Sequence, residues 1–171
     1  MGNLGNAYQT VNDFTRALDC HIRALELDRQ LGDKQSEGID LGNLGITYRK
    51  MGLLDKAVEC CRRDLIIARE VNDRRGQAQA LGNLGICYTD QKQFEEALHC
   101  HEAALNLFRE IGDQFGEANL YSNLAETYRM MGDETLARQY ETMATSLNSR
   151  SPFGQSESAL QSRNPAPAHR I

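Results

Sequence analysis

The chain has 171 residues, of which 24 are acidic and 19 basic, so its formal net charge at pH 7 is −5. A chain of this length can bury one sizeable core, and its acidic balance argues against the basic face that nucleic-acid binding requires. Because it contains neither an apolar run of about 18 residues, as a membrane span needs, nor a secretory leader, we expect a soluble, cytoplasmic protein without a membrane span.

A four-residue motif recurs along the chain at intervals of 40 residues. It reads Gly-Asn-Leu-Gly at residues 2–5, 42–45 and 82–85, and Ser-Asn-Leu-Ala at residues 122–125. Other columns share the interval, namely Tyr8, Tyr48, Tyr88 and Tyr128, and Ala17, Ala57, Ala97 and Ala137. Independent columns with one period indicate tandem repeats. We predict a repeat array over residues 1–148, with units at 1–32, 33–72, 73–112 and 113–148.

Each unit is predicted to form two antiparallel helices. In the second unit Leu44 and Tyr48 are four residues apart and so share one helix face, and Ala57 and Leu65 mark the core side of the next helix. Gly or Asn suits the left-handed residue that ends a helix, and Asp caps the next one. Such signals occur at Asn12-Asp13, Gly32-Asp33, Gly52, Asn72-Asp73, Gly112-Asp113 and Gly132-Asp133. Lys92 stands where the third unit would have its turn Gly.

Both ends depart from the repeat pattern. Met1 occupies the position of Leu41 in the second unit, so the first unit is truncated at its N-terminal side. An array needs polar faces at its ends, and we therefore expect the first hairpin to fray or to self-associate. Residues 149–171 are rich in Ser, Pro, Gln and Asn and have no apolar period, so we predict a disordered tail.

The repeat columns resemble the tetratricopeptide repeat (TPR), with Leu-Gly followed by Tyr, a turn Gly and two Ala. The 40-residue period with its Asn-Leu-Gly motif is most similar to the LGN/Pins family of G-protein-signalling modulators and, less closely, to kinesin light chains. The resemblance covers residues 2–148 and implies an all-α, right-handed α-solenoid whose first helices line a concave groove. It does not extend to Gα binding, because residues 149–171 carry no GoLoco motif.

Asparagine recurs in the middle of every predicted first helix, at Asn3, Asn43, Asn83 and Asn123. Asn is a poorer helix former than Ala by roughly half a kcal/mol, but its amide can both donate to and accept from a peptide main chain. The resemblance supports this, because related arrays use Asn at the matching position to hold bound peptide. We expect ligand contact, foremost at Asn43 and Asn83. The alternative is a hydrogen bond to the neighbouring repeat.

Stepping 100° per residue from Leu44 and Tyr48 identifies the face opposite the core. Ile46 and Ile86 on this face could contact a ligand or pack against the adjacent repeat. The basic residues Arg49, Lys50, Arg75 and Arg129 could pair with an acidic, amphipathic ligand, or could be solvated surface charges. The predicted peptide-binding groove comprises Asn3, Ile39, Asn43, Ile46, Arg49, Lys50, Gln79, Asn83, Ile86, Asn119, Asn123 and Arg129.

Residue types that carry catalysis or bind metals are present without a matching arrangement. The five cysteines form no CxxC pair, and we expect those at positions 20, 60 and 100 to be small buried groups. We expect His21 and His101 to pack between helices. We therefore predict no enzymatic activity, no cofactor and no metal site.

The predicted function is that of a protein-interaction scaffold or adaptor that binds a partner peptide in its concave groove, with intracellular signalling as one setting for it. The alternative is a regulatory or sensor segment of a larger multidomain signalling protein.

Overall fold

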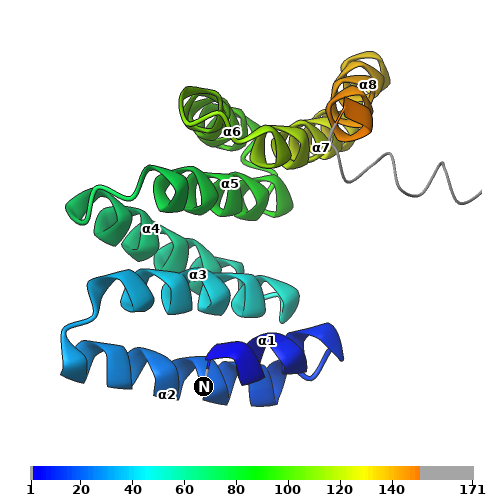
Figure 1. Cartoon of the computed structure of the whole chain (residues 1–171). Coiled ribbons are helices and arrows are strands. Elements are labelled where there is room, and N and C mark those ends of the chain that lie inside the picture. The colour runs from blue at the N-terminus through cyan, green and yellow to red at the C-terminus, as the bar shows by residue number, and fades with distance from the viewer. Residues whose placement is uncertain (1, 151–171) are drawn as a thin grey trace, which may run out of the picture.

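The structure, a computed structural model, describes residues 2–150 as eight helices and no strands. The helices are α1 (Gly2–Thr10), α2 (Phe14–Leu31), α3 (Lys34–Lys50), α4 (Leu54–Glu70), α5 (Arg74–Asp90), α6 (Phe94–Glu110), α7 (Gln114–Met131) and α8 (Glu134–Arg150). Consecutive helices pair as hairpins, and the hairpins follow one another in a curved stack from α1–α2 to α7–α8 (Figure 1). The predicted all-α solenoid of helix-turn-helix units is confirmed. Residues 151–171 of the predicted tail lie outside the described residues, and α8 continues to Arg150.

A residue with left-handed backbone ends every helix up to α7, at a spacing of 20 residues. These residues are Asn12, Gly32, Gly52, Asn72, Lys92, Gly112 and Gly132. Asp follows at five of the seven turns, and each of these carboxylates accepts a hydrogen bond from a backbone N–H three residues later. The turn chemistry read from the sequence therefore ends one helix and starts the next, as expected.

Lys92 is the one lysine among these left-handed positions, with φ at +61°. A left-handed backbone lowers the stability of the folded state by about 1–2 kcal/mol when the residue has a Cβ. Glycine avoids this strain but lowers stability by up to about 1 kcal/mol, because it adds conformational entropy to the unfolded chain. Because the strain is the larger effect, we expect Lys92→Gly to raise the free energy of unfolding by about 0.5–1 kcal/mol, measured by urea denaturation. The control is Gly112→Ala, at φ +69°, which should lower it. A Lys92→Gly protein that is no more stable than the wild type would contradict the strain.

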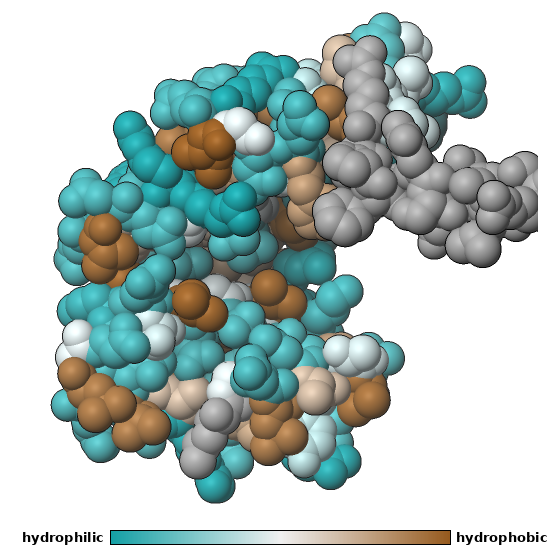
Figure 2. All heavy atoms as spheres, viewed as in Figure 1, coloured by the Kyte–Doolittle hydropathy of each residue, from teal (hydrophilic) through white to brown (hydrophobic). Residues whose placement is uncertain are grey.

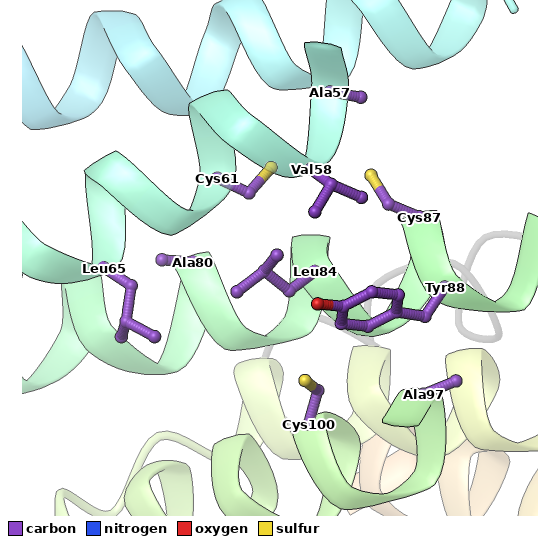
Figure 3. Close-up of a cluster of buried hydrophobic side chains, with 10 residues drawn as sticks. All are labelled: Ala57, Val58, Cys61, Leu65, Ala80, Leu84, Cys87, Tyr88, Ala97 and Cys100. Carbon is purple, nitrogen blue, oxygen red and sulfur yellow. The ribbon is translucent and has the colours of Figure 1, made fainter. Parts of the chain in front are cut away.

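The core continues from one hairpin to the next. One cluster joins residues of α4, α5 and α6, among them Leu65, Leu84 and three cysteines (Figure 3). Cys61, Cys87 and Cys100 are buried in it, in keeping with the role of a cysteine as a small apolar side chain. Cys20 and Cys60 are only half-buried. Small Ala57 and Ala97 are fully buried in the same cluster, which allows the helices to approach closely.

A glycine in the first helix of three hairpins faces a bulkier residue of the second helix. A Cβ on Gly5 would lie 2.5 Å from the His21 ring, and one on Gly85 would lie 2.4 Å from the His101 ring. In the second hairpin the Gly45 position faces the Cys61 sulfur at 2.5 Å. Both histidines are fully buried. The second Gly of the repeated motif is therefore required by helix packing, because it makes room for these side chains.

The first helices of successive hairpins form the inner layer of the array. Helix α1 contacts α3, α3 contacts α5, and α5 contacts α7, whereas within residues 2–150 successive second helices make at most marginal contacts of this kind. Polar links join neighbouring inner helices, among them a 2.8 Å hydrogen bond between the Thr89 and Thr127 hydroxyls. The stack therefore curves with α1, α3, α5 and α7 on its inside.

The face of the molecule that Figure 2 shows is mostly polar. In the view of Figure 2 apolar side chains lie singly or in small groups among hydrophilic ones. On the first hairpin Leu4, Leu27 and Leu31 are exposed, and self-association through this hairpin stays a prediction. No helix within residues 2–150 combines the length and the apolar character that crossing a bilayer would take.

Candidate binding groove

An open groove of about 740 Å³ runs along the inner layer. Its walls come from α3, α5 and α7, and its floor includes residues of α4 and the ends of the connections that follow α4 and α6. It is long enough to be lined by residues of three successive hairpins. Such a shape suits an elongated ligand better than a compact one.

Three asparagines of the repeated column line this groove. Asn43, Asn83 and Asn123 contribute from α3, α5 and α7, respectively, and each is half-buried. Within residues 2–150 none of their side-chain amides makes a hydrogen bond. The side chains of Gln9 and Thr47 donate to the backbone carbonyl of Asn43, and that of Thr127 donates to the backbone carbonyl of Asn123. The amides thus keep donors and acceptors for a ligand. Asn3 is exposed on α1 and does not line the groove.

Bare backbone adjoins two of these asparagines. Gly42 and Gly82 both line the groove, and a Cβ at Gly82 would meet only Leu120, at 3.7 Å. Glycine at these positions leaves space beside the amides through which a ligand main chain can approach closely.

Apolar side chains lie along the same groove. Ile39 and Phe115 line it although they are 59 % and 73 % exposed, and Ile46 lines it half-buried. Covering exposed apolar side chains of this size with a ligand removes apolar surface from water and so stabilises the complex. Ile86 is half-buried outside the groove lining.

Most of the basic residues predicted for the groove lie outside its lining. Arg49 forms an ion pair of 2.9 Å with Asp90, which joins α3 to α5. Arg129 pairs with Glu126 and Glu141, and Lys50 is exposed at the end of α3. These charges are therefore not arranged around a shared ligand position.

The charged residues that do line the groove are mostly acidic. They are Asp64, Asp73, Asp113 and Arg75. Arg75 pairs with Asp113 at 3.1 Å, and Asp73 caps α5 by accepting from the Gly76 N–H. Asp64 is only 8 % exposed, and burial raises its pKa from 3.8 to about 7. The groove thus offers more negative than positive charge to a ligand.

Seven of the twelve residues predicted from the sequence come together in the groove. They are Ile39, Asn43, Ile46, Gln79, Asn83, Asn119 and Asn123. Asn3, Arg49, Lys50, Ile86 and Arg129 do not line it. The prediction took all its residues from first helices and so missed the floor, where Asp64 is the most distinctive side chain. The signal for Asp64 was present, because it replaces the Ala of the other units at positions 24, 104 and 144.

Within residues 2–150 no three His, Cys, Asp or Glu side chains lie close enough together to hold a metal ion. The groove amides and glycines can form hydrogen bonds with a ligand, and its apolar groups can be covered by one. These groove residues can therefore bind a ligand through non-covalent contacts.

Stacked helical hairpins with an inner groove define the class of α-solenoid repeat proteins. The tetratricopeptide repeat family model matches residues 1–63, 39–110 and 76–149. The chain belongs to the tetratricopeptide repeat family. Its sequence matches no curated protein.

Solved structures share this fold at low sequence identity. A Rap protein complexed with competence and sporulation factor superposes with a TM-score of 0.81 at 20 % identity, over 94 % of this chain and 45 % of its own. BtubC (BKLC) from P. vanneervenii gives 0.73 at 17 % identity, over 99 % of this chain and 66 % of its own. The nearly identical TPR-like repeats of a P. anserina kinesin light chain give 0.70 at 14 %, over 95 % and 86 %. The chain thus spans less than half of that Rap protein and about two thirds of BtubC.

Proposed function

We propose that the chain is a protein-interaction scaffold that holds an extended peptide segment of a partner protein in the groove along α3, α5 and α7. The observation that carries this proposal is the set of three half-buried asparagine amides, from three successive hairpins, that line one groove without a partner among residues 2–150. A binding role without catalysis is part of the proposal.

The energetics favour a main-chain ligand. Each amide hydrogen bond contributes about 0.5–1.5 kcal/mol net, so two or three of them hold a strand without reading its side chains. The exposed Ile39 and Phe115 would add apolar contacts near the ligand's ends. Related support comes from the Rap protein, whose solved structure contains competence and sporulation factor.

The test uses peptides selected on the 171-residue protein from a displayed library of random 12-residue sequences. We expect Asn43→Ala/Asn83→Ala to weaken a selected peptide about 5- to 100-fold, because two hydrogen bonds are lost. Isothermal titration calorimetry gives the affinity, and circular dichroism should show unchanged helicity. The control is Asn106→Ala, an exposed asparagine of α6 outside the groove lining. Equal affinities of wild type and double variant would refute the amide contacts.

A second proposed function is that of a regulatory or sensor segment within a larger signalling protein. The Rap protein favours it, because this chain spans only 45 % of that protein. The finer resemblance to LGN/Pins is likewise a proposal, and we expect no binding of a GDP-form Gα subunit. The residues on which that expectation rests lie largely outside those that the structure describes.

A further inference from the structure

We propose that Asp64 makes the groove selective for peptides that place a lysine or arginine side chain on its floor. The inference rests on the proposed function, because it presupposes that a peptide occupies the groove. It deepens that proposal by naming a side chain that the groove reads, in addition to the main chain that the asparagines hold.

The first observation is the isolation of the Asp64 carboxylate. The residue lines the groove and is more than nine-tenths buried. Among residues 2–150 no side chain or backbone group forms a hydrogen bond or ion pair with its carboxylate, and the charge nearest to it in effect is that of Asp73. The fully buried polar atoms without a partner within residues 2–150 lie elsewhere, on His21, Asp28 and His101, so the Asp64 oxygens remain open to the groove. A largely buried carboxylate is stabilised when a cation pairs with it.

The second observation is the bare surface of α3 over the carboxylate. A Cβ on Gly38 would lie 3.3 Å from the Asp64 Oδ1 atom, and one on Gly42 would lie 2.9 Å from Oδ2. With glycine at both positions, no side chain of these two residues covers the carboxylate. The neighbouring groove residues Ile67 and Ala68 are apolar. A lysine or arginine can lay its aliphatic stem along such a surface while its charged end meets a carboxylate.

The third observation is that, within residues 2–150, the groove lining holds no unpaired basic side chain. Arg75, the one basic residue of the lining within residues 2–150, pairs with Asp113 at 3.1 Å. The remaining groove carboxylate, Asp73, already accepts a hydrogen bond from the Gly76 N–H at the start of α5. The partner charge that this groove complements is therefore positive. The acidic partner expected from Arg49, Lys50, Arg75 and Arg129 carries the opposite charge.

The other repeat units show which residue this position holds without a carboxylate. At the position of Asp64 they carry Ala24, Ala104 and Ala144, all buried. The repeat therefore packs with a methyl group at this position, and Asp64→Ala returns the second unit to the pattern of its neighbours. A single carboxylate also suits an ammonium or guanidinium group, since within residues 2–150 no set of three metal-ligating residues forms.

The experiment selects displayed 12-residue random peptides on the full 171-residue wild type and, in parallel, on Asp64→Ala. We expect wild-type binders to share a lysine or arginine at one position, and binders of Asp64→Ala to lack that enrichment. A wild-type binder is then synthesised with its lysine and with norleucine, which keeps the stem and removes the charge. Norleucine should weaken binding to the wild type at least tenfold, and to Asp64→Ala less than threefold. Asp64→Asn, which keeps the shape of the side chain, should behave as Asp64→Ala does.

The outcomes separate the two proposals. Wild-type binders without a shared cation, or an equal effect of norleucine on wild type and Asp64→Ala, would overturn this inference and leave the scaffold proposal standing. Peptides whose affinity is insensitive to the Asn43/Asn83 double substitution would overturn the amide contacts instead. A wild-type protein that selects no peptide would overturn both.

Discussion

Gly85→Ala should destabilise the protein by about 2–3 kcal/mol, a large effect for a single methyl group. The added Cβ would lie 2.4 Å from the fully buried His101 ring, much closer than two non-bonded atoms can approach. Either the ring must leave its position or α5 and α6 must separate. Overpacking of this kind outweighs the gain of up to about 1 kcal/mol that Ala brings to a helix interior. Urea denaturation followed by circular dichroism measures the loss.

Gly82→Ala is the matched control, one turn earlier in the same helix. Its Cβ would meet only Leu120 at an ordinary 3.7 Å, so the helix-propensity gain remains and stability should stay equal or rise. In the double variant Gly85→Ala/His101→Ala the new methyl group enters the space left by the ring. The two losses should therefore fall short of adding, by at least about 1 kcal/mol. If Gly82→Ala and Gly85→Ala changed stability alike, the packing argument would be wrong.

Asp64→Ala should make stability strongly pH-dependent, with a loss of about 3 kcal/mol between pH 6.5 and pH 4. Burial lowers the pKa of His101 from 6.5 to about 4, so over this range the unfolded chain binds a proton that the folded chain excludes. Stability from His101 is thus present above pH 6.5 and is lost as the pH falls, by about 1.4 kcal/mol per unit. Denaturation curves at several pH values measure it.

In the wild type Asp64 offsets this loss. Burial, with a smaller contribution from Asp73, raises the pKa of Asp64 from 3.8 to about 7. The folded chain therefore holds a proton that the unfolded chain releases, and stability from this residue grows as the pH falls. We expect the wild type to be nearly flat in this range. His101→Cys, which places at this position the residue type of Cys61 in the second unit, should become more stable in acid. Parallel pH profiles for wild type and both variants would exclude these titrations.

Much of the fold could be predicted from the sequence because each repeat contains the residues that end one helix and cap the next. The 40-residue columns gave the hairpins, and the Gly-Asp and Asn-Asp pairs marked helix ends that the structure confirms. Register alone placed a turn at Lys92, whose side chain does not favour one. The role of the second motif glycine could not be predicted, because it depends on how deeply His101 of α6 enters the contact with α5.

The sequence could predict which helix face lines the groove, but not how far the groove extends along each helix. A helical wheel places Asn43, Asn83 and Asn123 on one face, and the structure brings them into one groove. The wheel does not say how far along each helix a groove continues. Arg49 and Arg129, close to the C-terminal ends of α3 and α7, therefore lie beyond it. The floor depends on which turn of α4 meets the inner layer, a tertiary relation that helix periodicity does not contain.

The measurement that most directly tests the central claim uses a groove-binding peptide methylated at one main-chain nitrogen at a time. N-methylation removes a backbone donor and leaves every side chain in place. If asparagine amides hold the main chain, at least one methylated peptide should bind the wild type about fivefold or more weakly, and that loss should largely disappear in Asn83→Ala or Asn43→Ala. A peptide that tolerates methylation at every position, or that loses the same affinity with and without the asparagines, would contradict the claim.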